Sequence, residues 1–317
     1  MKFSCVGGCH ICCRYMRLSP EEFLDNPERI TAALRFGMHT TPPGGFRGRR
    51  IMRDMLRRHP WDEKYHAFFE TIIVDAGLEA QMDGLCPHLK NPDTKKERRE
   101  HPADIAGCRL QDKPLWCRAR PLDPSLPECL QDEALYFLKT HMNCPGKIEP
   151  EKDGLVQQRW LRGSTLAPCE ASEAFFQLQR QQEEWLPVME ILTVRLFERM
   201  GEDEVKIFRS GLSRDMFRAF PVSVFLGACV EAGRVTKERA LEILKVQKRK
   251  YGEAMEDFRK KYGKKMLFPE RRRDDGDNVG FSRERFLARM RAWSEECGKI
   301  LSAAKIDFCA VSRHSAR

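Results

Sequence analysis

Phe3-Ser4-Cys5-Val6-Gly7-Gly8-Cys9-His10-Ile11-Cys12-Cys13 is the stretch that decides how the first half of this chain folds. It places four thiols within nine residues. Successive residues of a helix or strand point to different sides, so thiols this close together do not all enter one apolar core. The two glycines permit a sharp turn that lets the first two cysteines converge. The stretch therefore predicts metal ligation by Cys5, Cys9, Cys12 and Cys13.

Single cysteines follow at wider spacing in the next part of the chain. Two of them precede a proline, as in Cys86-Pro87 and Cys144-Pro145. A proline places such residues in extended or turning backbone, which suits ligands brought in by loops. We expect the remote ligands of the metal site, or sites, to be Cys86, Cys108, Cys117 and Cys144.

Disulfide pairing is the main alternative explanation for clustered cysteines. The chain has 13 cysteines in 317 residues, an odd number and a proportion well below the roughly 8–10% of disulfide scaffolds. The first residues contain no apolar run typical of a secretion signal, and we find no stretch of about 18 apolar residues that predicts a membrane span. We therefore expect a reducing, cytoplasmic location, where such a pattern favours metal binding.

The order and neighbours of these cysteines resemble the YkgJ-type cysteine-cluster family, which is described as zinc- or iron-chelating. That family has an aromatic residue before Cys-x-x-Cys-x-x-Cys-Cys, then Cys-Pro-x-Leu, a further Cys, Pro-x-x-Cys-Arg-x-x-Pro and Cys-x-Gly. The similar segments here are Phe3–Cys13, Cys86–Leu89, Cys108–Leu110, Pro114–Pro121 and Cys144–Gly146. The first gap has three residues instead of two, and about seventy residues separate Cys13 from Cys86. The resemblance implies a metal-binding domain over about residues 1–150.

Thiolates are soft ligands that select zinc, copper(I) or iron–sulfur clusters. Structural zinc sites usually combine two close pairs of ligands, whereas iron–sulfur clusters often take three close cysteines and a remote one. Our preferred hypothesis is an iron–sulfur cluster of the four-iron type, with zinc as the second candidate. Eight thiols are enough for more than one site. We do not count the histidines near these cysteines as ligands: His10, His88 and His101.

The spacing Cys5-x3-Cys9-x2-Cys12 also matches radical S-adenosylmethionine enzymes. Those enzymes resemble partial barrels with a strand before the motif and alternating strands and helices after it. Here only four residues precede Cys5, and mainly helical patterns follow. This alternative is therefore the weaker one.

Two functions from different classes remain. The first is a metal-binding module whose cluster has a structural, redox or sensing role. The second is an S-adenosylmethionine-dependent enzyme that resembles the flagellin lysine methylases, in which a related cysteine-rich motif precedes a largely helical body. No phosphate-binding loop, hydrolase elbow or glycine-rich dinucleotide turn is present. We name no catalytic base, nucleophile or donor pocket, so the metal-binding module is preferred.

The fold class is mainly α: an irregular, cysteine-rich domain over residues 1–150 and an α-helical domain over 151–317. Apolar residues recur at three- and four-residue spacing over 170–202, where Pro187 kinks the helix or starts a new one. Further helices are expected over 203–233, with Pro221 inside, over 236–262 after a Thr236 cap, and over 282–304. Residues 266–280 are predicted to be a charged linker or loop. No sustained strand alternation is found, although residues 71–75 fit a short strand or a helix.

Nearer the N-terminus, Ser19 caps a predicted helix that has Pro20 at its first position. A basic helix is also predicted over residues 47–58. The remaining cysteines are predicted to be ordinary buried or scattered residues: Cys129, Cys169, Cys229, Cys297 and Cys309.

The formal net charge of +9 comes mostly from the second half, around Lys245–Lys265 and Arg271–Arg273. Acidic residues are interspersed there, so a solvated helix face is favoured over nucleic-acid binding. A protein partner at the helical half is compatible with this pattern.

Overall fold

The structure is a computed structural model that describes residues 2–4, 16–40, 61–62, 67–76, 112–132, 134–135, 147–149, 154–159, 163–202, 217–262 and 283–303. The chain divides into two compact units, each built from separate segments. Unit 1 comprises Met1–Ser19, His39–Phe69 and Leu85–Leu186, and unit 2 comprises Pro20–Met38, Glu70–Gly84 and Pro187–Arg317. The division does not coincide with the expected boundary at residue 150, because residues on both sides of that position pack together in unit 1.

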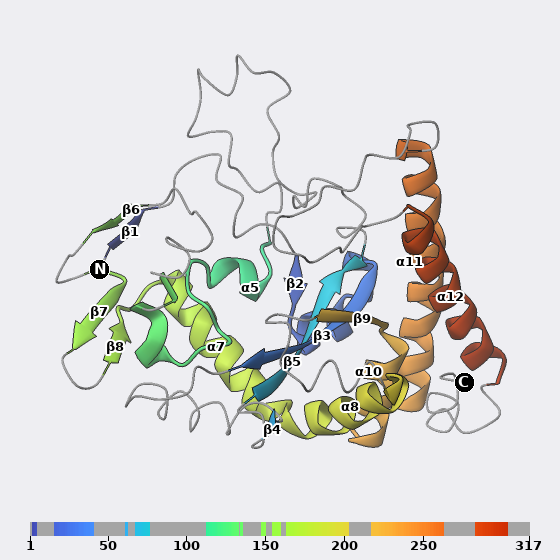
Figure 1. Cartoon of the computed structure of the whole chain (residues 1–317), viewed down its shortest axis with the longest axis horizontal. Coiled ribbons are helices and arrows are strands. Elements are labelled where there is room, and N and C mark those ends of the chain that lie inside the picture. Colours follow the sequence, from blue (N-terminus) through green and yellow to red (C-terminus); the bar gives the residue numbers. More distant parts are fainter. Residues whose placement is uncertain are drawn as a thin grey trace, which may run out of the picture. The chain divides into compact units, whose positions relative to one another are not determined.

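Unit 1 contains short strands and few helices in its described part (Figure 1). Its elements are β1 (Lys2–Ser4), β2 (Arg17–Leu18), β4 (Trp61–Asp62), α5 (Leu115–Arg118), η4 (Glu128–Leu130), β6 (Lys147–Glu149), β7 (Val156–Arg159), β8 (Gly163–Leu166) and α7 (Glu170–Glu184). Three antiparallel pairings connect them: β1 with β6, β7 with β8, and β4 with the first residues of β5 (Ala67–Asp75). These short ladders leave most of the unit's stability to side-chain packing.

The core of unit 1 forms where α7 packs on α5. Phe175 and Leu178 of α7, which are fully buried, join Leu115 and Trp116 of α5 in one apolar cluster. The α7 residues lie three apart and so share one face of the helix. The buried Gln131 side chain supports the turn beside this cluster: it accepts from the Asp123 N–H (2.9 Å) and donates to three carbonyl oxygens.

Unit 2 combines a small sheet with longer helices. Its elements are α1 (Pro20–Asp25), η1 (Pro27–Arg29), β3 (Ala32–Thr40), most of β5, α8 (Leu186–Arg199), β9 (Phe217–Pro221), α10 (Ser223–Glu231), α11 (Lys237–Tyr262) and α12 (Arg283–Ser302). The strand order β5-β3-β9 puts β3 in the middle. The register of β3 with β9 runs from Ala33 opposite Pro221 to Gly37 opposite Phe217.

The helices of unit 2 are held together by aromatic contacts and by buried polar anchors. α11 and α12 lie side by side (Figure 1), with ring centroids 4.8 Å apart for Phe258–Phe286 and 5.7 Å apart for Tyr251–Trp293. The fully buried Gln247 of α11 accepts from the Ala32 N–H (2.8 Å) and donates to the carbonyls of Pro27 and Ile30. This one side chain therefore fixes α11 against the start of β3.

Several helix predictions are confirmed. A helix begins at Pro20, and α8 is a new helix that starts at Leu186, one residue before Pro187. α11 begins after Thr236, whose Oγ1 accepts the Arg239 N–H at 3.2 Å, and it ends at Tyr262. α12 occupies most of the predicted 282–304 segment. The description of the chain as mainly helical holds, while the predicted helix over 47–58 and the linker over 266–280 lie outside the described residues.

Two strand assignments correct the sequence analysis. β3 was not expected, and β9 occupies residues that were expected to be helical. β3 lies between two other strands, and its residues Ala32, Ala33 and Leu34 are all fully buried. A strand buried on both faces has no apolar–polar alternation, so its periodicity carries no strand signal. β5 resolves the ambiguity over residues 71–75 in favour of a strand.

None of the helices in the described part of the chain combines the length and apolar character that crossing a membrane requires.

Candidate metal centre

Of the eight predicted ligands, Cys117 is the one that the structure describes. The other seven lie outside the described residues, as do the three nearby histidines: Cys5, Cys9, Cys12, Cys13, Cys86, Cys108, Cys144, His10, His88 and His101. The described part of the candidate site therefore consists of Cys117 and the segments that flank the other cysteines.

Cys117 lies on α5, a single helical turn that follows Pro114. Its N–H donates to the Pro114 carbonyl at 2.8 Å, and the residue is half-buried. Its neighbour Trp116 is buried in the core of unit 1, which fixes α5 to α7. A half-buried cysteine on a firmly anchored turn has the accessibility that a metal ligand needs.

β2 lies against α5 and joins the N-terminal cysteine stretch to the Cys117 turn. Arg17 of β2 places its guanidinium carbon 5.2 Å from the centroid of the Trp116 ring, a cation–π contact. Cys13 precedes Arg17 by four residues, and Cys117 follows Trp116 directly. The contact between β2 and α5 therefore brings the flanks of two predicted ligands together.

The pairing of β1 with β6 joins two further ligand-bearing segments. Ser4 is the last residue of β1 and lies opposite Lys147, the first residue of β6. In the sequence, Cys5 follows Ser4 directly and Cys144 precedes Lys147 by three positions. Because the strands are antiparallel, both cysteines connect to the same end of this two-stranded ladder.

Among the described residues, no group of three or more His, Cys, Asp or Glu side chains is arranged to hold a metal ion. This part of the chain contains a single predicted ligand, Cys117.

The cysteines that were expected to be ordinary residues differ between the two units. Cys229 and Cys297 of unit 2 are fully buried, which confirms the prediction for Cys229. Burial raises the pKa of the Cys297 thiol from 9.0 to about 12, and burial also raises the pKa of Cys229 strongly. In unit 1, Cys129 is buried and Cys169 is half-buried at the start of α7, while Cys309 lies outside the described residues.

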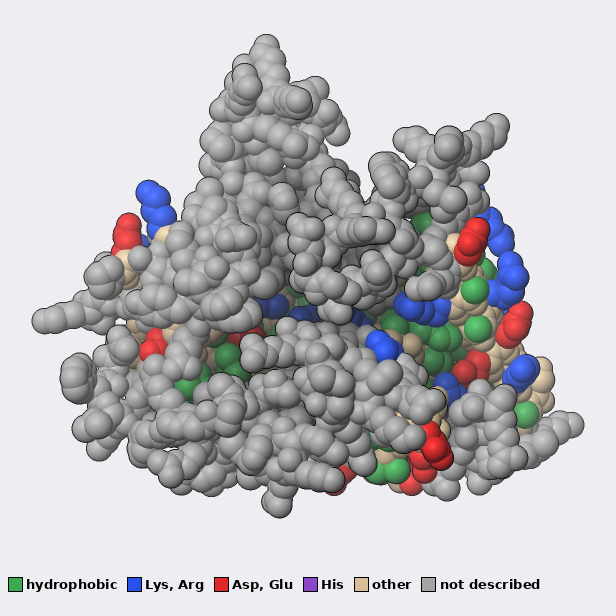
Figure 2. Space-filling view, in the orientation of Figure 1, with side chains coloured by type: hydrophobic (Ala, Val, Ile, Leu, Met, Phe, Trp, Pro, Cys, Tyr) green, Lys and Arg blue, Asp and Glu red, His purple; other side chains and the backbone are tan. Residues whose placement is uncertain are grey.

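Basic and acidic side chains alternate on the α11–α12 surface (Figure 2). Arg249 of α11 forms ion pairs with Glu28 and Glu253, and Arg239 forms one with Glu242 at 3.2 Å. Mixed charges of this kind are typical of a solvated helix face. The described part of this surface gives no specific support to nucleic-acid binding.

Comparisons of the chain with family models, with curated proteins and with solved structures found no match in any of the three.

Two features of the site were missed by the sequence analysis. The segments Lys2–Ser4 and Lys147–Glu149 are only three residues each and show no clear alternation. The contact of Arg17 with Trp116 joins residues that are far apart in the sequence. No local pattern in the sequence identifies either feature.

Proposed function

We propose that this protein is a metal-binding protein that holds an iron–sulfur cluster of the four-iron type in unit 1, with zinc as the second candidate. The ligands are drawn from Cys5, Cys9, Cys12 and Cys13 together with Cys86, Cys108, Cys117 and Cys144. The observation that carries the proposal is the register of β1 with β6, in which Ser4 lies opposite Lys147.

Covalent geometry turns that register into a limit on distance. Consecutive Cα atoms are about 3.8 Å apart, and paired residues of antiparallel strands are about 4.5–5.5 Å apart. Cys5 is one residue from the ladder and Cys144 is three residues from it. Although 139 positions separate these cysteines in the sequence, their connections to the ladder are compatible with binding to one metal centre.

The contact between β2 and α5 is a second observation that supports a common metal centre for N-terminal and remote cysteines. It connects the chain after Cys13 to the residue before Cys117. Cys5 and Cys13 belong to the same short stretch, so the two contacts involve the described segments on either side of it. Iron–sulfur clusters often take three cysteines that are close in the sequence and one that is remote. The cysteines of this chain fit that pattern.

The cluster would supply the binding energy that joins these short segments. Ligands must be deprotonated to bind, and a site absent from the unfolded chain contributes its binding energy to folding. The expected role is structural, redox or sensing, in a reducing cytoplasm, with any protein partner on the helical unit and with nucleic acid disfavoured.

The test is the content of metal and acid-labile sulfide per chain, with a visible spectrum, on full-length protein purified without oxygen. About four irons with equal sulfide and a broad absorption near about 400 nm are expected. Colourless protein with about one or two zinc ions would instead indicate a closed structural zinc site. Protein free of both metals would overturn the proposal.

A Cys144→Ser variant tests the convergence itself, with Cys229→Ala as the matched control. We expect the Cys144 variant to lose metal and the control to keep the full content. If iron and sulfide are present, methyl transfer from S-adenosylmethionine to lysine is the activity to assay next, because the methylase is the alternative function.

A further inference from the structure

Arg118 directly follows Cys117 in the helical turn α5, and both lie on the side of the turn that faces away from the core. Leu115, Trp116 and Ala119 are buried in the apolar cluster of unit 1, whereas Cys117 and Arg118 are half-buried. Successive helical residues are rotated by about 100°, so the three core residues occupy one side and leave the other to Cys117 and Arg118. The turn therefore places a cation next to a predicted metal ligand.

The backbone of the α5 turn is fixed. The N–H groups of Arg118 and Ala119 donate to the carbonyls of Pro114 and Leu115, at 2.9 Å and 2.8 Å. Trp116 packs in the core of unit 1. A side chain that starts from such a fixed backbone needs less ordering when it binds an anion, so the position of Arg118 suits recognition.

The Nε atom of Arg118 is a buried donor that has no hydrogen-bond partner among the described residues. A guanidinium carries five N–H donors and no acceptor, so acceptors satisfy it, and anionic acceptors bind it most strongly. Burying a donor without a partner is costly, and buried polar groups are nearly always paired. The burial of this atom therefore points to an acceptor outside the described residues.

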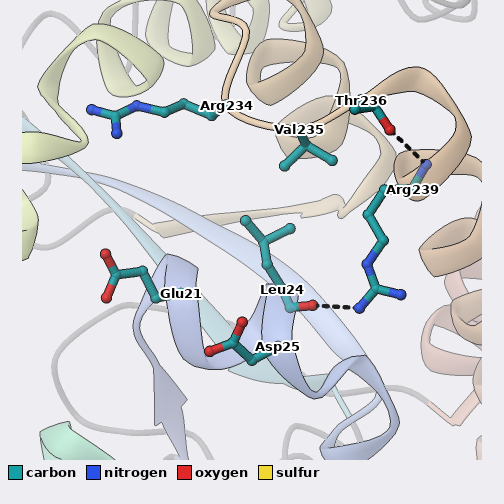
Figure 3. A pocket seen from close by; sticks show the side chains of 7 residues that line it. All are labelled: Glu21, Leu24, Asp25, Arg234, Val235, Thr236 and Arg239. Carbon is teal, nitrogen blue, oxygen red and sulfur yellow. Dashed lines mark hydrogen bonds between the residues drawn. The ribbon is translucent and has the colours of Figure 1, made fainter.

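Arginines of unit 2 show the usual arrangement, in which the guanidinium has an acceptor. Arg199 is largely buried and forms an ion pair with Glu296 at 2.9 Å. Arg239 lies at a pocket of about 510 Å³ beside α1, where it donates to the Leu24 carbonyl at 2.9 Å (Figure 3). For the guanidinium of Arg118, no such acceptor is found within the described part of the chain. Arg118 therefore differs from these arginines by being available to an acceptor near Cys117.

We propose that Arg118 provides the counter-charge of the metal centre in unit 1, and that its guanidinium donates hydrogen bonds to sulfur atoms of that centre. The inference rests on the proposed function, because the acceptor is the metal centre itself. A zinc ion or a four-iron cluster held by four thiolates has a net negative charge. Such a charge, when buried, needs an opposite charge and hydrogen bonds close to it. The Arg118 guanidinium supplies both.

This contact has a consequence for metal affinity and one for reduction potential. Groups that bind the ligands from outside the coordination sphere typically change metal affinity about 10–100-fold. The potential of an iron–sulfur cluster depends on its net charge and on hydrogen bonds to its sulfurs. One-electron reduction adds a negative charge to the cluster, and the guanidinium stabilises that charge. Arg118 therefore raises the reduction potential.

Substitution of Arg118 in full-length protein purified without oxygen tests the proposal. Arg118→Gln should release its bound iron or zinc to EDTA about tenfold faster than the wild type. In an iron–sulfur protein, the midpoint potential, read from the visible spectrum during titration with dithionite, should also fall. We expect a tenfold change in the ratio of reduced to oxidised protein, which is about 59 mV for one electron. Arg118→Lys keeps the charge and should lie between Arg118→Gln and the wild type.

Arg180→Gln is the matched control, because Arg180 is an exposed arginine of α7 in the same unit. It should keep wild-type metal release and potential, and circular dichroism checks that each variant is folded. Wild-type behaviour of Arg118→Gln would overturn the role of Arg118 and leave the metal centre intact. Equal effects of Arg118→Gln and Arg118→Lys would also contradict it, because lost packing then explains the change. Wild-type protein without bound metal would overturn the proposed function as well, so the two failures are distinguishable.

Discussion

The described cysteines of the two units differ in their environment. Cys229 and Cys297 of unit 2 are fully buried among helices, and burial raises the pKa of both thiols. In unit 1, Cys117 lies within the single turn α5 and Cys169 lies at the N-terminus of α7, and both are half-buried. Cysteine acts as a small apolar residue in the first setting and as an accessible thiol in the second. Among the described cysteines, the one predicted ligand, Cys117, is half-buried, but so is Cys169, which is not a predicted ligand; burial alone therefore does not assign the ligands.

The units are similar in one respect, which is how they secure irregular backbone. Gln247 in unit 2 and Gln131 in unit 1 are both fully buried, and each amide binds several backbone groups. A buried amide is stabilising when its donors and acceptors are all satisfied. Unit 1 differs in that its described ladders β1–β6 and β7–β8 are only three and four residue pairs long, so the proposed metal centre would have more folding energy to add there.

The largest expected effect is the loss of metal from unit 1. Replacing Cys12 and Cys13 together by Ser should remove the bound metal and unfold unit 1, because the binding energy of the ligands is folding energy. Metal analysis and limited proteolysis measure the two effects. Metal content equal to that of the wild type would remove both residues from the ligand set.

The next largest effect is expected in unit 2. Gln247→Ala leaves the Ala32 N–H and the carbonyls of Pro27 and Ile30 without this partner. Buried groups left unsatisfied cost about 1–3 kcal/mol each, so we expect the free energy of unfolding, measured with urea, to fall by about 3 kcal/mol or more. Tyr251→Phe is the matched control, since it removes one bond to the Ala32 carbonyl and should cost about 1 kcal/mol. Equal costs for the two variants would contradict the anchoring role of Gln247.

A smaller effect is expected for Cys229→Ala. The side chain is fully buried in α10, so its truncation should cost about 1–2 kcal/mol through lost packing. Metal content should stay at the wild-type value. A fall in metal content would contradict the prediction that Cys229 is a core residue and not a ligand.

The smallest effect concerns alkaline pH. Burial, and secondarily Glu296, raise the pKa of Cys297 to about 12, so above pH 9 the unfolded chain loses this proton while the folded chain keeps it. The stability from the neutral thiol is complete below pH 9 and falls as the pH rises toward 12, by about 1 kcal/mol between pH 9 and 10. Other groups titrate there too, so the measurement is the difference in urea unfolding between wild type and Cys297→Ala. Parallel pH profiles would show that the thiol does not contribute.

Helices with a strong local signal were predictable. α11 has a capping residue and apolar positions on one face, and the start of α8 at Leu186 follows from Pro187, which is tolerated only in the first turn of a helix. β3 was not predictable, because Ala32, Ala33 and Leu34 are buried on both faces and have the pattern of neither a helix nor an edge strand. β9 was assigned to a helix because the partner that makes Phe217–Pro221 a strand is β3, far away in the sequence.

By itself, the sequence predicted metal ligation by thiols in the first half and determined the main helices of the second, because ligand spacing, capping and helical periodicity are local properties. The tertiary structure alone decided that Ser4 pairs with Lys147, that Arg17 contacts Trp116, and that Asp25 and Arg234 line one pocket. Each of these pairs brings together residues about a hundred or more positions apart. Such contacts depend on which surfaces are buried against each other when the whole chain folds, and short-range sequence patterns do not record that choice.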